Sequence, residues 1–360
     1  MDKKVKLFSN CIPVKGVSRA VICDMQLQTI HYIPDSLYDL IIEHFGKSPN
    51  EIKKAYDHQY DAIIDEYLSF LEEKNCIFYT DFPEKFSDID LKWEYPYPIS
   101  NAIIDRDHTS SYDIFKVLKQ LDELYCKSVQ LRFFDEVQKS YIIEVLDFLN
   151  YEESILSSIE IYVPHSDWTA IVNVSNVFKE YLRVSQICVY SASKNEISDI
   201  NNDGRLLMYT DQEINSEKHC GAISMDYFSV NLKTFTESQK FNSCLNRKIS
   251  VDSKGEIKNC PSMEISYGNI ENTSLKKALE HPNFKNHWSI TKDQVTICKN
   301  CEFRYVCTDC RAYVENPEDE YSKPLKCGYD PYTNNWEKWS TNPLKEKAVL
   351  YYEMPEIIKK

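Results

Sequence analysis

A closely spaced set of cysteines constrains this chain more than any other feature. Four of its 13 cysteines fall within the 13 residues 298–310, two more members of the set precede this run and one follows it. Thiolates repel one another and lose hydration when they are gathered, so such a group is usually neutralised by a soft cation or an iron–sulfur cluster. The full array consists of Cys244, Cys260, Cys298, Cys301, Cys307, Cys310 and Cys327.

The spacing favours iron–sulfur over zinc. A zinc ribbon pairs two CxxC knuckles across ~15–20 residues, whereas five residues separate Cys301 from Cys307. Compact runs of this kind suit cubane clusters, because neighbouring cysteines can ligate different clusters. Seven thiolates also do not divide into closed four-cysteine zinc sites. We expect one complete 4Fe–4S site and one with three cysteines, with zinc or no metal as the alternatives.

Composition limits the partners and the compartment. The net charge of -14 argues against nucleic acid or an anionic membrane as the main partner. No run of ~18 apolar residues predicts a transmembrane helix, and the first residues do not resemble a signal segment. We expect a cytoplasmic protein, in which thiols stay reduced and favour metal binding over disulfides. The seven glycines stand singly, so no glycine-rich loop for a nucleotide phosphate is expected.

Hydrophobic periodicity sets residues 1–82 apart as a first domain. Strand-like segments at 7–13, 18–24 and 29–33 precede three helical patterns. Ser48-Pro49 is typical of a helix start, since proline is tolerated in the first turn. With a closing strand near residues 76–79, this order predicts a winged-helix-like unit.

The rest of the chain divides into three further parts. Residues 83–229 alternate strand and helix patterns about four times, which predicts an α/β domain with a mostly parallel sheet covered by helices. Residues 230–345 hold the cysteine array and few periodic segments, apart from a helix starting near Ser274. Metal binding would supply the order that such a region lacks. Residues 346–360 form a tail that is either a short helix or loose.

The array reads C-x10-G-x4-C, then C-x2-C-x5-C-x2-C, then a final C. It resembles the SPASM domain, which binds auxiliary 4Fe–4S clusters in maturases of ribosomally made peptides, although the family usually has three residues in the last gap of the central run. Gly255 ends a predicted hairpin turn that brings Cys244 and Cys260 towards one site. The resemblance implies a first cluster on Cys244, Cys260 and Cys310, and a second cluster on Cys298, Cys301, Cys307 and Cys327.

The fourth ligand of the first cluster has no clear match in the family pattern. Cys220, in the segment His219-Cys220-Gly221, is a candidate. The alternatives are that Cys220 is a loop or core cysteine, and that the fourth iron is left open to peptide or solvent. The other cysteines stand mostly among apolar residues, where buried structural thiols are the default. These are Cys11, Cys23, Cys76, Cys126 and Cys188.

SPASM domains usually follow a radical SAM barrel, whose first strand is followed by CxxxCxxC. Here the expected place, residues 105–111, holds no cysteine, and the glycine-rich turn of that family is replaced by residues 133–136. The resemblance therefore implies a partial radical-SAM-like (β/α) barrel that binds no S-adenosylmethionine. Two charged segments, Asp105-Arg106-Asp107-His108 and Phe134-Asp135-Glu136, stand at predicted strand ends, where they are either acid–base groups or solvated loop charges. Catalytic residues cannot be assigned from these patterns.

Three segments extend the resemblance to the SPASM-domain peptide maturases of grasp-with-spasm cassettes: residues 258–262, 298–313 and 327–332. This implies two partners, a precursor peptide and an ATP-grasp ligase. It also implies that residues 1–82 bind a leader peptide as an added edge strand. A domain that only packs on the barrel, or one that binds DNA, are the alternatives for this unit.

The expected function is therefore that of an iron–sulfur peptide maturase or maturation partner without radical SAM cleavage. A redox enzyme with an open auxiliary cluster and a zinc-stabilised adaptor remain as alternatives.

Overall fold

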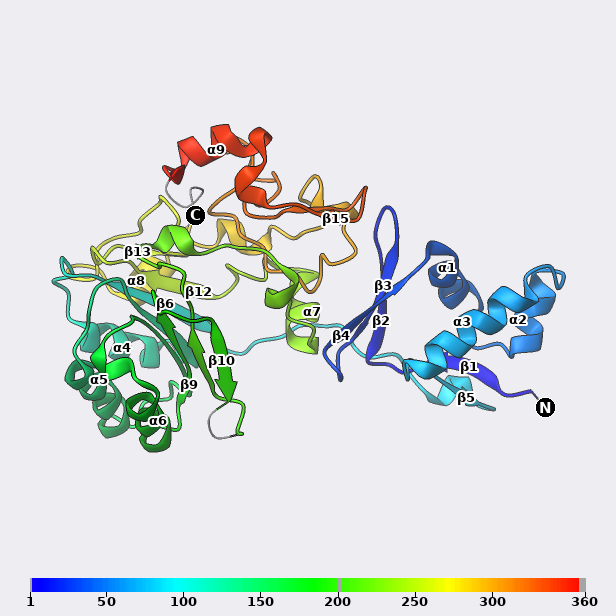
Figure 1. Ribbon diagram of the computed structural model, residues 1–360, viewed down its shortest axis with the longest axis horizontal. Helices are drawn as coiled ribbons and strands as arrows, with labels where there is room; N and C mark the ends of the chain where they lie inside the picture. The colour runs from blue at the N-terminus through cyan, green and yellow to red at the C-terminus, as the bar shows by residue number, and fades with distance from the viewer. Residues whose placement is uncertain (1, 200–201, 356–360) are drawn as a thin grey trace.

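The computed structural model describes residues 2–199 and 202–355. Figure 1 shows an N-terminal unit on the right, a sheet covered by helices at the lower left, and an irregular region above that sheet. An extended stretch of chain leads from the N-terminal unit to the sheet. Among the described residues, no helix is long and apolar enough to cross a membrane.

The N-terminal unit contains two small antiparallel sheets and three helices. One sheet pairs β1 (Lys4–Leu7) with β5 (Ile77–Thr80). The other has the order β2-β3-β4, with the bounds Cys11–Lys15, Ala20–Asp24 and Thr29–Ile33. The helices are α1 (Asp35–His44), α2 (Pro49–Ala55) and α3 (Asp61–Glu73).

Local signals explain these boundaries. The Ser48 side chain accepts a hydrogen bond from the Glu51 amide, and the Glu51 carboxylate accepts one from the Ser48 amide, so α2 begins with a capping box. The prediction of a single strand over residues 7–13 is wrong. A turn interrupts it, in which the amide of Cys11 donates to the carbonyl of Phe8 over 2.9 Å, and it becomes β1 and β2.

An eight-stranded sheet has the order β10-β11-β9-β8-β7-β6-β12-β13. The six strands from β11 to β12 are parallel to their neighbours, and β10 and β13 pair antiparallel at the two edges. This confirms the predicted α/β class with a mostly parallel sheet. The bounds are β6 Asn101–Arg106, β7 Ser128–Phe133, β8 Ser158–Pro164, β9 Val184–Tyr190, β10 Glu196–Asp199, β11 Leu206–Tyr209, β12 Lys248–Val251 and β13 Ile257–Lys258.

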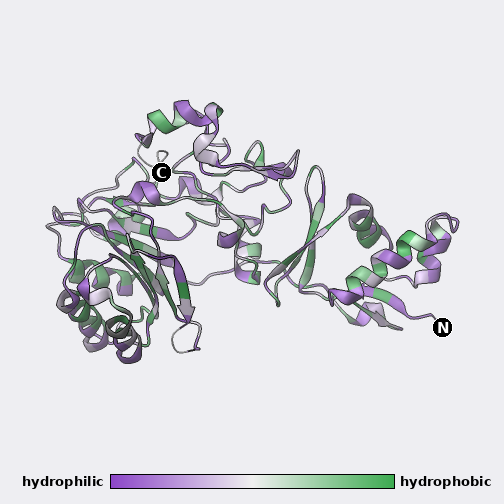
Figure 2. Cartoon of the chain, in the orientation of Figure 1, coloured by the Kyte–Doolittle hydropathy of each residue, from purple (hydrophilic) through white to green (hydrophobic). Residues whose placement is uncertain are grey.

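The two faces of this sheet differ in polarity because side chains alternate along each strand. One face is apolar and packs against α4 (Ile114–Glu123), α5 (Lys139–Tyr151) and α6 (Ile171–Glu180). Figure 2 shows the hydrophobic residues of these strands and helices. The opposite face carries a row of polar side chains, here called the polar face: Asp105, Gln130, Arg132, Glu160, Tyr162 and Gln186.

The cysteine-rich region contributes β12 and β13 to this sheet and is otherwise mostly irregular. The predicted hairpin turn forms: the amide of Gly255 donates to the carbonyl of Asp252 over 2.9 Å, and Gly255 has a φ of 81°. The predicted helix also forms, with the Ser274 side chain accepting from the Lys277 amide. The remaining elements are α7 (Leu232–Ser238), α8 (Leu275–Leu279), β14 (Tyr329–Asp330), β15 (Asn335–Trp336) and α9 (Glu346–Tyr351).

Short 3-10 helices connect several of these elements. They span Pro83–Lys85, Asp167–Thr169, Glu217–His219, Met225–Tyr227, Asn286–Ser289, Cys298–Asn300, Trp339–Thr341 and Pro343–Lys345.

Candidate metal centres

One set of thiols, here called the first thiol group, gathers above the polar face of the sheet. Cys260 stands two residues after the end of β13, and its thiol interacts electrostatically with those of Cys220 and Cys244. The Cys310 thiol interacts with the same two partners. A Cβ atom on Gly221 would lie 2.8 Å from the Cys310 sulfur, so the backbone after Cys220 packs closely against Cys310. The group consists of Cys220, Cys244, Cys260 and Cys310.

A second thiol group forms in the C-terminal part of the array. The Cys307 thiol interacts with the thiols of Cys327 and Cys298. The Cys301 thiol interacts with those of Cys298 and Cys307. A 3-10 helix over Cys298–Asn300 connects Cys298 to Cys301. The group consists of Cys298, Cys301, Cys307 and Cys327.

In the structure, Cys220 lies with Cys244, Cys260 and Cys310, and the other four array cysteines lie together. The assignment of these thiols as cluster ligands stays a prediction. Cys220 differs in sequence context from the five cysteines that stand among apolar residues, since the polar residues Lys218 and His219 precede it. All 13 cysteines are free thiols.

The distances between the thiols allow a test of which centre they fit. A tetrahedral zinc ion with Zn–S bonds of ~2.3 Å holds its four sulfurs within about 4 Å of one another. In the described part of the chain, no three cysteine sulfurs all lie within 4.8 Å of one another. A four-iron cubane separates its ligands further, because each thiolate binds a different iron atom. Each group offers four thiols, the donor number of a 4Fe–4S cluster.

Burial and nearby cations shape the chemistry of both groups. Burial raises the pKa of the Cys260, Cys307 and Cys310 thiols to about 12 in each case. Metal binding must therefore displace protons from these thiols. Each group also has a lysine beside it: Lys248 Nζ lies 3.5 Å from the Cys244 sulfur, and Lys292 Nζ lies 3.6 Å from the Cys307 sulfur. Neither lysine was identified from the sequence, because nothing in the pattern separates it from a surface lysine.

The N-terminal unit covers the second thiol group. One face of the β2–β4 sheet packs on the helices of that unit, whereas Val14, Val21 and Cys23 on the other face pack in one apolar cluster with Cys307 and Cys327. Arg19 Nε donates to the buried carboxylate of Glu302 over 2.6 Å, next to Cys301. The sequence contains no signal for this contact, which joins residues 283 positions apart.

The polar strand ends were the other candidate site, and the structure brings them together. His108 Nδ1 lies 2.6 Å from the Asp135 carboxylate, and Asp107 completes a set whose ligand atoms all lie within 4.8 Å of one another. Hydrogen bonding to Asp135 raises the pKa of His108. The His108 side chain is 79% exposed, so solvent screens this pair strongly.

A buried ion pair lies next to these strand ends. Arg132 donates two hydrogen bonds, of 2.6 and 2.7 Å, to the Asp105 carboxylate, and both side chains are buried. The pair lies on the polar face, and Arg132 interacts electrostatically with Cys220 and Cys260. The first thiol group therefore faces the polar side of the sheet.

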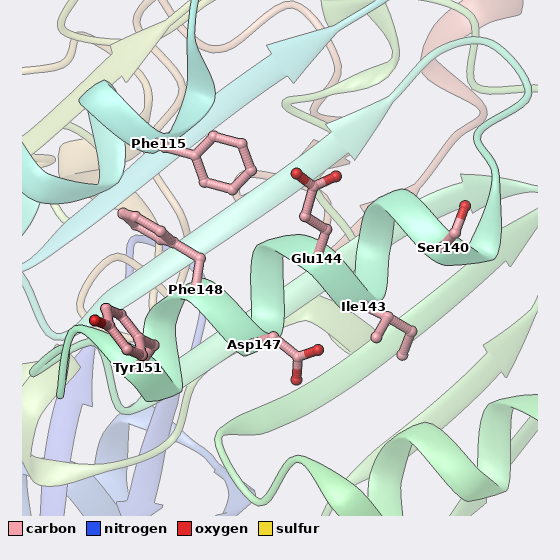
Figure 3. A pocket seen from close by; sticks show the side chains of 7 residues that line it. All are labelled: Phe115, Ser140, Ile143, Glu144, Asp147, Phe148 and Tyr151. Carbon is pink, nitrogen blue, oxygen red and sulfur yellow. The ribbon is translucent and has the colours of Figure 1, made fainter.

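Two cavities differ in their relation to the thiols. Figure 3 shows the first, of about 660 Å³, between α4 and α5 on the outer layer of helices, with no cysteine in its lining. A larger cavity of about 1050 Å³ also has no cysteine in its lining, but it is lined by His219 and Ala222, which flank Cys220 and Gly221, and by Lys326. The second cavity gives the surroundings of the first thiol group an opening to the surface.

Comparison with known proteins supports the metal assignment. Residues 243–302 match the SPASM iron–sulfur cluster-binding domain, so the chain carries such a domain in its C-terminal half. This match includes Cys244, Cys260, Cys298 and Cys301. No match was found among curated proteins.

Two solved structures align with most of the chain at low similarity. One is SuiB of Streptococcus suis bound to S-adenosylmethionine, with 9% identity, a TM-score of 0.30, and coverage of 89% of this chain and 98% of SuiB. The other is SuiB bound to the precursor peptide SuiA, with 10% identity, a TM-score of 0.28, and coverage of 86% and 96%. These likenesses are too weak to bear on function.

Proposed function

We propose that this chain is a two-cluster iron–sulfur protein that acts in the maturation of a ribosomally synthesised precursor peptide, together with an ATP-grasp ligase. The observation that carries the proposal is the pair of four-thiol groups in a chain with a SPASM domain. Each group would hold one 4Fe–4S cluster, which when bound supplies a one-electron redox centre.

The residues around the thiols have defined roles in this proposal. With Cys220 included, the first thiol group offers a protein ligand to every iron, and this favours a closed cluster over one with an open iron. The nearby lysines reduce the cost of gathering negative charge in a buried place. Arg132 adds a further cation on the side of the sheet.

The N-terminal unit is the proposed peptide-binding domain. Its four strands, three helices and closing strand β5 support a winged-helix-like arrangement. Among the described strands, β4 pairs only with β3, so its outer edge is available for main-chain hydrogen bonds from an extended peptide. The face of the β2–β4 sheet that turns away from the helices packs against Cys307 and Cys327 of the second thiol group. A leader peptide added to the edge of β4 would therefore lie close to the second cluster.

The parallel sheet is proposed to be a partial radical-SAM-like barrel without its cofactor. The loop after β6 holds Asp107 and His108 instead of three thiols, and the buried Arg132–Asp105 pair occupies the polar face beside it. We therefore assign no S-adenosylmethionine cleavage to this chain. The roles of precursor peptide and ATP-grasp partner rest on the family resemblance of the cysteine array.

Anaerobic reconstitution with an iron and sulfide count tests the metal assignment. Two cubanes give about eight irons per chain and a broad brown absorbance. Bound zinc without colour would refute both clusters. The same preparation, incubated with S-adenosylmethionine and a reductant, is expected to form no 5′-deoxyadenosine, and its formation would overturn the reading of the barrel.

Peptide binding is tested on the full chain by hydrogen exchange. Candidate precursor peptides encoded next to the gene are added, and the amides of β4 are expected to become protected while those of α5 are unchanged. Saturable binding without protection of β4 would move the peptide site elsewhere. No binding by any candidate would remove the role.

A further inference from the structure

A buried ionic network lies between the two thiol groups. Asp309 is its centre, and its side chain is 1% exposed. One carboxylate oxygen, Oδ1, lies 2.7 Å from Arg311 Nη2 and 3.6 Å from Lys292 Nζ. The other oxygen, Oδ2, accepts a hydrogen bond of 2.9 Å from Asn242. Two cations therefore share one carboxylate in a buried place.

The network reaches both groups. On one side, Lys292 Nζ lies 3.6 Å from the Cys307 sulfur and 4.0 Å from the Cys298 sulfur. On the other side, the Asn242 side chain that donates to Asp309 accepts a hydrogen bond from the amide of Cys244 over 3.0 Å. A continuous chain of polar contacts thus runs from a cysteine of the first group to two cysteines of the second.

The charges of this network do not balance without the thiols. Lys292 and Arg311 carry two positive charges against the single negative charge of Asp309, and all three side chains are at most 5% exposed. Burying an unpaired charge is costly. The Arg311 guanidinium donates to the carbonyls of Glu320 and Ser322, which carry no charge. The remaining positive charge on Lys292 faces the second thiol group.

We propose that Lys292 is a charge-compensating residue of the second cluster that raises its reduction potential, and that Asp309 opposes this effect. The proposal rests on the proposed function, since it requires a cluster on the second thiol group. One-electron reduction adds a negative charge to the cluster. A buried cation at this distance favours the reduced state, because Coulomb energies are large where solvent is excluded. The negative charge of Asp309 acts in the opposite direction, so removing it favours the reduced state.

The test is a redox titration of the anaerobically reconstituted full chain with dithionite, followed by electron paramagnetic resonance. In Lys292→Met, which keeps a long apolar stem without the charge, the potential of one of the two clusters is expected to fall. The expected change is about tenfold or more in the one-electron equilibrium constant, ~59 mV. Asp309→Asn is expected to raise the same potential, and Lys292→Arg to restore it. Lys299→Met is the matched control, since this exposed lysine stands between Cys298 and Cys301.

The outcomes separate this inference from the proposed function. If the wild-type chain binds no iron, the proposed function fails first. If it binds two clusters and Lys292→Met leaves both potentials unchanged, the inference alone is wrong. If Lys292→Met loses about four irons while Lys292→Arg keeps them, the positive charge is needed to hold the cluster, which supports the inference. If both variants lose the cluster, shape and not charge is decisive, and the inference is overturned.

Discussion

The cysteine-rich region and the carboxyl edge of the parallel sheet both gather side chains that bind metals, but in different surroundings. Five of the eight cysteines in the thiol groups are buried and three are partly buried, and each group has a lysine beside it. At the sheet edge, His108 and Asp135 pair on the surface, where water already satisfies them. The comparison teaches that a cluster of potential ligands indicates a metal centre more strongly when the side chains are buried, because buried polar groups without a partner cost free energy.

The largest expected effect is the loss of one cluster. The double variant Cys298→Ala/Cys301→Ala removes two ligands of the second thiol group, so bound iron is expected to fall from about eight to about four per chain. An iron assay after anaerobic reconstitution measures this. Cys126→Ala is the control, because this buried cysteine packs in the core beneath the sheet and belongs to neither group. Unchanged iron in the double variant would contradict the second group as a cluster site.

A smaller loss of iron is expected when Cys220 is replaced by alanine. The first thiol group would keep three ligands, and a cubane with three ligands holds its fourth iron loosely. We expect about four to seven irons per chain and a faster loss of colour on dilution. Cys188→Ala is the control, since Cys188 lies on the polar side of β9 outside the group. Equal iron and equal stability in both variants would mean that Cys220 is not a ligand.

The cover over the second thiol group is expected to depend on Arg19. In Arg19→Met, the buried Glu302 carboxylate loses its charged donor, and the free energy of unfolding is expected to fall by about 1–3 kcal/mol. Hydrogen exchange in β3 is expected to rise at the same time, because this contact joins the N-terminal unit to the cysteine-rich region. In Lys15→Met, which breaks only an exposed pair with Asp39, the fall is expected to stay below about 0.5 kcal/mol. Similar losses in both variants would mean that the contact does not hold the cover in place.

The smallest effect is expected at the sheet edge. Asp135 raises the pKa of His108, so the imidazole is expected to titrate above ~6.5 by nuclear magnetic resonance. The ion pair then stabilises the protein below the pKa of the unfolded state and is lost as the pH rises through the folded pKa. Asp135→Asn is expected to lower this pKa and to leave the iron content unchanged. A loss of iron in this variant would show that the edge takes part in metal binding.

The N-terminal helices and the sheet could be predicted from the sequence because their signals are local. The capping box of Ser48 and Glu51, the turn ending at Gly255 and the cap at Ser274 each act over a few residues. The turn within residues 7–13 was missed, since Phe8 and Cys11 are compatible with a continuous strand. The parallel pairing of β12 with β6 could not be predicted either, because the sequence of a strand does not specify which strand it pairs with.

The spacing of the cysteines was enough by itself to indicate iron–sulfur chemistry, since ligands a few residues apart meet without help from the rest of the fold. Three contacts are visible only in the tertiary structure. The backbone after Cys220 packs against Cys310, Lys292 lies beside the thiol of Cys307, and the N-terminal sheet packs over the second thiol group. These contacts join segments that are far apart in the chain. Burial and charge balance decide them, and a single sequence does not reveal which distant segments will share a core.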